Sequence, residues 1–143
     1  MGKKGNGQGS GGASETSGGA VVLDAGALIA FERAERRMAA LFEEAMEADE
    51  ELLVPASVLA QVWRGGSRSA RIARLIASTM SDPLDEARAR EVGERLGSRN
   101  MADIADAHAV CCAIERDAEL LTTDRDDIEA LIDHSERLTV VSI

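Results

Sequence analysis

The fold is indicated by ten residues near the start of the chain, VVLDAGALIA, at positions 21–30. Val21 to Leu23 form a short apolar run without polar alternation, which is typical of a strand buried on both faces of a parallel sheet. Asp24 follows this run directly, and it could cap a helix that begins near Ala25. A strand, an acid and a helix in immediate succession predict one α/β unit, with the acid at the carboxyl end of the strand.

The same succession recurs along the rest of the chain. Three more short runs are rich in Leu, Val and Ile, and apolar residues at helical spacing fill the intervals between them. This alternation predicts an α/β fold with a mostly parallel sheet. The expected strands are Val21–Leu23, Leu52–Val54, Leu120–Thr123 and Leu138–Ile143, and the helical patterns fall at 35–46, 58–62, 72–76, 92–96 and 102–114.

Length and composition limit the classes of function. The chain has 143 residues, enough for one domain with a sizeable core. Its 16 basic and 26 acidic residues give a formal net charge of -10, which argues against a non-specific nucleic-acid binder with a basic surface. An acidic nuclease is not excluded, because its acids can hold metal in one small site. The adjacent Cys111 and Cys112 suit a buried, reduced pair in a cytoplasmic protein.

Residues 1–20 differ in composition from the rest of the chain. They contain eight of the 13 glycines, mixed with Ser, Asn, Gln and Thr. Such a segment buries too little apolar surface to offset its ordering entropy, so we expect a disordered Gly/Ser-rich tail followed by a single domain at 21–143. The start of the chain has no apolar segment of the signal-peptide kind, and no long apolar run predicts a transmembrane helix.

Four carboxylates are candidates for a site at one edge of the predicted sheet. Asp24 ends the first strand and Asp124 follows the third, and ligands of such sheets bind beyond the carboxyl ends of the strands. Each could instead cap the helix after it, with Asp127 at the third position of the helix that follows Asp124. Asp106 is harder to explain structurally, because it lies in a predicted helix that is otherwise apolar, where an unpaired charge is costly.

Taken together, these acids predict a metal site. Clustered carboxylates repel one another unless a cation lies between them, and their hard oxygen atoms suit Mg²⁺ or Mn²⁺. Asp103 lies on the same helix face as Asp106. The structural alternative is that Asp103 lies near the start of the helix, where the helix dipole stabilises an acid. His108 and His134 are isolated, so the chain has no zinc-binding spacing. The chemistry that remains is metal-assisted hydrolysis of a phosphodiester.

Three stretches of the chain resemble a known family. They are VLDAGALIA (22–30), LLVPASVLAQVWRGG (52–66) and DAHAVCCAIERDAELLTTDRDD (106–127), and they look like PIN-domain ribonucleases, in particular the VapC-type toxins of bacterial toxin–antitoxin pairs. The resemblance covers nearly all of 21–143. It implies a PIN-like three-layer α/β/α sandwich and a Mg²⁺- or Mn²⁺-dependent endoribonuclease. It also implies an RNA substrate, a cognate antitoxin and a homodimer.

The resemblance assigns roles to residues of the acidic set. Thr122 corresponds to the supporting hydroxyl of the family's T-x-D motif. A further acid, variably placed in the family, corresponds to Asp127 or less closely to Asp126, and Asp103 is an additional candidate ligand. Asp24 corresponds to the family's first aspartate, Asp106 to its third acid and Asp124 to the acid of the T-x-D motif. The resemblance implies that these three are the catalytic and metal-binding residues.

Two residues depart from the family pattern. Gln61 stands where the family usually has Glu, so an oxygen is kept for a metal or a bound water, but the charge and the capacity to act as a base are lost. One interpretation is a catalytically impaired PIN-fold module that binds RNA or an antitoxin without cutting; the other is that Asp103 supplies the missing charge. Gly26 stands where many relatives have Ser, whose hydroxyl can help to order the site.

An arginine-rich stretch could meet RNA phosphates. Arg64, Arg68, Arg71 and Arg74 have no acid between them, and the last three share roughly one helical face. Arginine forks suit phosphate contacts, which position a nucleic acid without reading its sequence. An exposed, solvated face is the structural alternative. The resemblance implies that this region and the first helices also meet the antitoxin, and Trp63 is expected to pack rather than to stack on bases.

Overall fold

The computed structural model describes residues 19–143, so the predicted tail lies outside the described residues except for Gly19 and Ala20. Five parallel strands form one sheet in the order β4-β3-β2-β5-β6, with the first strand of the described residues at its centre. The strands are β2 (Ala20–Leu23), β3 (Glu51–Pro55), β4 (Met80–Asp82), β5 (Glu119–Thr122) and β6 (Val140–Ser142).

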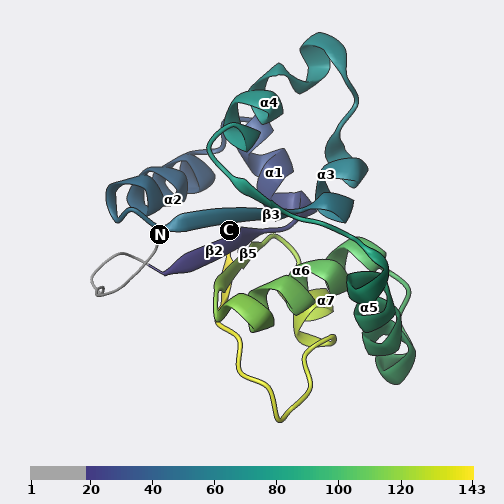
Figure 1. The fold of residues 1–143 in the computed structure, drawn as a ribbon. Helices are drawn as coiled ribbons and strands as arrows, with labels where there is room; N and C mark the ends of the chain where they lie inside the picture. The colour runs from purple at the N-terminus through teal and green to yellow at the C-terminus, as the bar shows by residue number, and fades with distance from the viewer. Residues whose placement is uncertain (1–18) are drawn as a thin grey trace, which may run out of the picture.

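Helices cover both faces of this sheet. Figure 1 shows α1 to α4 on one face and α5 to α7 on the other, which is the three-layer α/β/α sandwich that the sequence and its family resemblance predict. Among the described residues, no helix is long and apolar enough to cross a membrane. The helices are α1 (Ala25–Glu32), α2 (Arg36–Glu47), α3 (Ala56–Val62), the 3-10 helix η1 (Gly66–Ser69), α4 (Ala70–Ile76), α5 (Glu86–Arg99), α6 (Ile104–Arg116) and α7 (Arg125–Glu129).

The strand order places a switch point between β2 and β5. From β2 the chain moves outward to β3 and β4 with its helices on one face, and it then returns to the other side of β2 as β5 and β6, with its helices on the second face. At such a point the connections leave adjacent strands in opposite directions, and a crevice opens beyond the carboxyl ends of the strands. The fold therefore directs the segments after β2 and β5 to the same crevice.

The core forms where the sheet meets α6. Eight of the 13 residues of α6 are buried, including Ala107, Val110 and Cys112 at 0% exposure, and the helix packs across β2, β3 and β5. This explains why the sequence of α6 is apolar on all sides, since it lies between the sheet, α5 and α7. Both cysteines are free and buried, as expected.

Some boundaries differ from the predictions. β4 was not predicted, because Met80–Asp82 has only three residues, two of them exposed, and no apolar run marks it. α7 spans Arg125–Glu129 and is shorter than the helix over 125–132 that the sequence after Asp124 predicts. α6 begins at Ile104, so Asp106 lies in its first turn and not in the interior of an apolar helix. The sequence-based argument that Asp106 is a buried interior charge was therefore wrong in its position, and the structure gives a different reason to single it out.

Candidate metal centre

Asp24 and Asp124 both lie at the switch point. Asp24 directly follows β2, and its backbone N–H donates to Leu121 O of β5 at 3.2 Å, which extends the pairing of the two strands by one residue. Asp124 lies two residues beyond the end of β5. Adjacent parallel strands thus bring to one place two acids that are 100 positions apart in the sequence.

Asp24 is a helix cap and a site residue at once. It is 3% exposed, and its Oδ1 accepts a hydrogen bond from Ala27 N at 2.8 Å, so the capping interpretation is confirmed. Burial raises the pKa of Asp24, while hydrogen bonds from the Thr122 hydroxyl and from the backbone of Ala27 and Gly26 act in the opposite direction. These donors fix the carboxylate in one orientation, and its position at the crevice leaves it available to a ligand.

Thr122 connects the first acid to the third. Its side chain is fully buried, its Oγ1 accepts from Asp124 N at 2.8 Å, and its hydroxyl also hydrogen-bonds to the Asp24 carboxylate. One hydroxyl can accept and donate simultaneously, so Thr122 bridges the segments that carry the two acids. This is the arrangement that a supporting hydroxyl requires.

Asp124 does not cap the helix that follows it. Although Asp124 occupies the N-cap position of α7, its side chain makes no capping hydrogen bond, so the structural alternative for this residue is wrong. A hydrogen bond with Asp124 and the charge of that residue raise the pKa of Asp127, which indicates that the two carboxyl groups lie close enough to share a proton. Both side chains are exposed toward solvent.

The charges of the other candidate acids affect the pKa of Asp106. Its backbone N–H donates to Asp103 Oδ1 at 2.9 Å, so Asp103 is the N-cap of α6. Partial burial and the charges of Asp103, Asp24, Asp124 and Asp127, in that order, raise the pKa of Asp106 to about 7. The other four acids that the sequence analysis named as candidate metal ligands therefore lie close enough to Asp106 for their charges to act on it.

The donor set fits a hard divalent cation, although it is not preformed. Within residues 19–143, no three Asp, Glu, His or Cys side chains converge closely enough to hold an ion as they stand. The charges that most affect Asp106 are nevertheless all acidic, and a carboxylate set without a neutralising Arg or Lys is the environment that Mg²⁺ or Mn²⁺ stabilises. Carboxylate side chains rotate readily, and a bound ion would draw these acids together.

Gln61 is exposed in the last turn of α3, and none of the described residues forms a hydrogen bond with its side chain. Asp103 uses one oxygen as a cap and keeps the second oxygen for other contacts, as the compensation hypothesis requires.

The arginine stretch takes a different shape from the one predicted. Gly65 and Gly66 have positive φ angles of 80° and 60°, and Arg68 lies in η1, so only Arg71 and Arg74 share α4. Those two side chains line a hollow formed with α1, α2 and the turn between them. None of the four predicted arginines forms an ion pair with a described acid, whereas Arg88, Arg90, Arg95, Arg116 and Arg125 all do.

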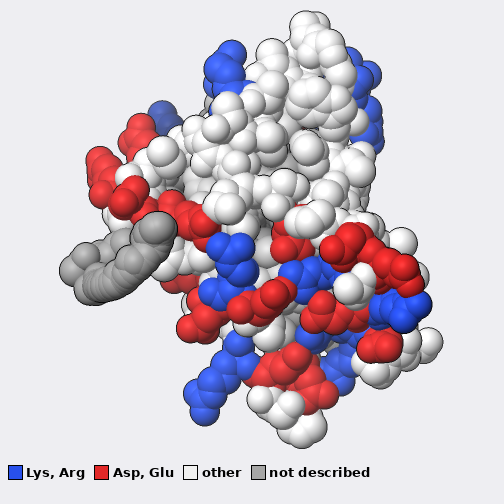
Figure 2. Space-filling view, viewed as in Figure 1, with Lys and Arg blue, Asp and Glu red and all other residues white. Residues whose placement is uncertain are grey.

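This difference is visible on the surface. Figure 2 shows blue side chains and no red ones around the upper part of the molecule, where Figure 1 places α4, while red and blue alternate over the lower part. Trp63, expected to be a packing residue, is 42% exposed and borders an apolar hollow between α3 and α4. The prediction for Trp63 was thus wrong in part, because a residue at the end of a short helix has neighbours on one side only.

A buried polar network near the site was not found from sequence. Ser57 Oγ donates to His108 Nδ1 at 2.7 Å, and His108 Nε2 donates to Asp82 Oδ2 at 2.7 Å. Arg88 pairs with the same carboxylate through Nε at 3.0 Å. His108 is 0% exposed and both of its ring nitrogens are hydrogen-bonded. One signal could have found its partners, because a histidine in a largely apolar helix needs polar neighbours.

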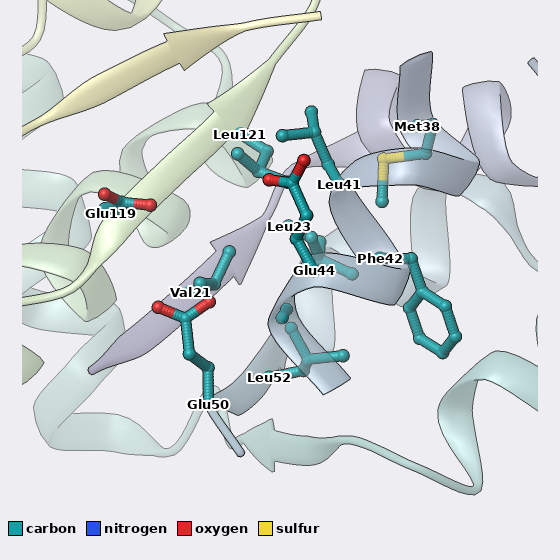
Figure 3. A pocket seen from close by; sticks show the side chains of 11 residues that line it. Val21, Leu23, Met38, Leu41, Phe42, Glu44, Glu50, Leu52, Glu119 and Leu121 are labelled. Carbon is teal, nitrogen blue, oxygen red and sulfur yellow. The ribbon is translucent and has the colours of Figure 1, made fainter. Parts of the chain in front are cut away.

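A further hollow lies between α2 and the sheet, away from the acids. Apolar side chains line most of it, among them Met38 and Phe42 of α2, and three glutamates stand at its rim (Figure 3). Glu50 directly precedes β3, so this hollow lies toward the amino ends of the strands. Burial and the charges of Glu119 and Glu44 raise the pKa of Glu50. The hollow is separate from the switch point and contributes no residue to the candidate metal centre.

The chain is similar in sequence to one known family. A family model described as "PIN domain" matches residues 21–131, which is most of the chain and includes all five acids. No protein with a curated description matches the sequence.

Solved structures of similar fold come from complexes. VapBC-1 from nontypeable Haemophilus influenzae matches with a TM-score of 0.63 and 15% identity, covering 86% of this chain and 97% of that chain. VapBC2 from Rickettsia felis, bound to a DNA fragment from its promoter, matches with a TM-score of 0.60 and 12% identity, covering 87% and 98%. FitAcB from Neisseria gonorrhoeae matches with a TM-score of 0.55 and 16% identity, covering 85% and 96%. At such identities the likeness establishes the fold alone.

Proposed function

We propose that the chain, which belongs to the PIN domain family, is a metal-dependent endoribonuclease and the toxin of a toxin–antitoxin pair. PIN domains are generally nucleases, and the observation that carries the proposal is the environment of Asp106. Partial burial, followed by the charges of four other acids, raises the pKa of this residue to about 7. A carboxylate cluster at this place is the kind of site that binds a divalent cation and a phosphodiester.

Each acid has a role in the proposed centre. Asp24, Asp106 and Asp124 would hold Mg²⁺ or Mn²⁺, and Asp127 and Asp103 would bind the ion directly or through water. A bound ion supplies an activated water and stabilises charge on the scissile phosphate. Within the protein, Thr122 and the start of α1 orient Asp24. Asp106, whose pKa is raised to about 7, would have to lose its proton to act as a ligand.

The substrate would be held beside this centre by positive charge. Arg64, Arg68 and Arg71 are free of described acidic partners, and arginine contacts to phosphate would position RNA without reading its sequence. The base-independent character of such contacts leaves cleavage specificity to other residues. The proposed place of action is the cytoplasm, where RNA and an antitoxin are both available.

The test is cleavage of a mixed RNA pool by purified protein, with and without Mg²⁺ or Mn²⁺. We expect metal-dependent cutting that is lost in Asp24→Asn and in Asp106→Asn. Asp117→Asn is the matched control, because Asp117 is exposed at the C-cap of α6 with a φ of 50°, a conformation that asparagine accepts well. Full activity of folded Asp24→Asn would overturn the proposed mechanism.

The solved relatives suggest the protein partner. Their descriptions name VapBC and FitAB assemblies, two of them with DNA, so a cognate antitoxin is proposed here as well. Co-expression with the product of an adjacent small reading frame, followed by co-purification, tests this proposal. Light scattering of the free protein tests the homodimer that the family resemblance implies.

A second candidate is a PIN-fold module that binds RNA or an antitoxin without cutting. Two observations favour it: Gln61 replaces the usual acid, and the described acids do not converge on an ion-sized space. Gln61→Glu separates the candidates. If the module is impaired, the wild type binds no Mn²⁺ in a calorimetric titration and Gln61→Glu gains binding; if the enzyme is competent, the wild type already binds and cleaves.

A further inference from the structure

The turn after β5 touches the start of α1 at one exceptionally close point. A Cβ placed on Gly26 would lie 1.9 Å from Thr123 Oγ1, 3.0 Å from Thr123 Cβ and 3.2 Å from Thr123 Cγ2. The threonine side chain therefore occupies the space that a side chain at position 26 would need. Rotation of Thr123 about χ1 would not relieve the overlap fully, because Cβ itself lies at 3.0 Å and does not move in that rotation.

The contact joins the two segments that carry the first and third acids. Gly26 is two residues beyond Asp24 and lies in the turn of α1 whose N–H groups hold the Asp24 carboxylate. Thr123 directly precedes Asp124. The neighbouring Thr122 links the same segments by hydrogen bonds from the buried side, while Thr123 is exposed and touches α1 from outside.

We propose that Gly26 and Thr123 form a spacing contact that sets the separation of Asp24 and Asp124, and with it the cation that the centre accepts. Hydrogen bonds through Thr122 hold the two segments together, and the Thr123 side chain limits how closely they approach. Mg²⁺ requires near-ideal octahedral geometry at short distances, whereas Ca²⁺ accepts longer and more variable ones. A displacement of a few tenths of an ångström should therefore penalise Mg²⁺ more than Ca²⁺.

Gly26→Ala tests the contact, because the contact predicts a loss of stability where helix propensity alone predicts a gain. In an unobstructed helix, replacing Gly by Ala raises stability through helix propensity. Gly93 of α5 is such a position, because nothing lies within 4 Å of a Cβ placed there, and Gly93→Ala is the matched control. We expect Gly93→Ala to raise the melting temperature and Gly26→Ala to lower it.

A second substitution should rescue the first. Thr123→Ala removes Oγ1 and Cγ2 but leaves the Cβ at 3.0 Å, so the double variant Gly26→Ala/Thr123→Ala should recover in part. Gly26→Ala/Thr123→Gly removes every close atom and should recover more of the loss. Such non-additivity is the signature of two residues in direct contact.

The metal affinities of these variants test the positioning role independently of their thermal stability. By calorimetry on metal-free protein, Gly26→Ala should bind Mg²⁺ about tenfold more weakly than wild type, in the range seen when outer-shell partners of metal sites are changed. Its affinity for Ca²⁺ should fall less, and Gly93→Ala should change neither. Equal loss for both ions would overturn the spacing role, and a Gly26→Ala variant that gains stability as Gly93→Ala does would overturn the contact itself.

The cation part of this inference rests on the proposed function. If wild-type protein binds neither Mg²⁺ nor Mn²⁺, the proposed function fails and the cation part fails with it. The melting temperatures of Gly26→Ala and its double variants still decide whether the contact exists, so the two failures are distinguishable.

Discussion

The ionised form of the Asp106 carboxyl group is destabilised in the metal-free protein. Burial and four neighbouring acids raise its pKa from the usual 3.8 to about 7. The folded state therefore holds this proton more tightly than the unfolded state does. The corresponding stability is complete below pH 4 and is lost as the pH rises from about 4 through 7.

Replacing Asp106 should stabilise the metal-free protein at high pH. An undiscounted shift of this size corresponds to about 4 kcal/mol, and because the group is half-exposed we expect solvent screening to leave about 1–2 kcal/mol. Asp106→Asn should thus melt higher than wild type at pH 8 in the presence of EDTA, and the difference should vanish near pH 4. A variant that melts lower than wild type at pH 8 would show that the acids do not repel one another.

The same pKa predicts proton release on metal binding. A carboxyl group that is half-protonated near pH 7 must lose its proton before it can ligate an ion, so Mn²⁺ affinity should rise as the pH increases through about 7. Titrations in two buffers of different ionisation enthalpy would measure this release, which should approach one proton per ion at pH 6. A proton count of zero at pH 6 would exclude Asp106 as a ligand.

At the scale of elements, α6 is held in place by the network around His108. Burial lowers the pKa of His108 and keeps the ring neutral, so Nε2 donates to Asp82 while Nδ1 accepts from Ser57. Burial alone would raise the pKa of Asp82, but hydrogen bonds from Arg88 and His108 hold it below its usual range. These bonds tie α6, which carries Asp106, to α3, β4 and α5.

Breaking this network should be costly. Asp82→Asn removes the charge that faces Arg88, whose side chain is 11% exposed, and it should destabilise the protein by about 3 kcal/mol in urea unfolding. The matched control is Glu86→Gln, which breaks the exposed pair with Arg90 and should cost less than about 0.5 kcal/mol. Similar losses for both variants would mean that the buried network contributes no more than a surface pair.

Elements with a strong local signal were predictable, and contacts between distant segments were not. Four of the five strands and the buried α6 follow from apolar runs and periodicity, whereas β4 has neither. The place of Asp24 could be predicted from its position directly after a strand, whereas Thr122 was singled out only by the family resemblance. The contact of Gly26 with Thr123 could not, since it joins residues 97 positions apart and depends on how closely α1 approaches the β5–α7 turn.

At the scale of the whole molecule, charge is unevenly distributed. The formal net charge is -10, yet residues 63–79 contain four arginines and no acid. Other arginines are neutralised by described partners, such as Arg90 by Glu86 and Arg116 by Glu51. An acidic enzyme that acts on a polyanion needs one such region, because the rest of its surface repels the substrate.

This charge distribution predicts which arginines cause the salt dependence of RNA binding. In the Asp24→Asn background, which the proposed function expects to leave RNA intact, Arg68→Ala/Arg71→Ala should weaken binding of single-stranded RNA. Each lost phosphate contact should also reduce the slope of log K against log salt concentration by about 0.7. Arg90→Ala, on an exposed and already paired side chain of α5, is the control and should leave the slope unchanged. An unchanged slope in the double variant would place the RNA path elsewhere on the molecule and reduce the α4 arginines to a solvated face.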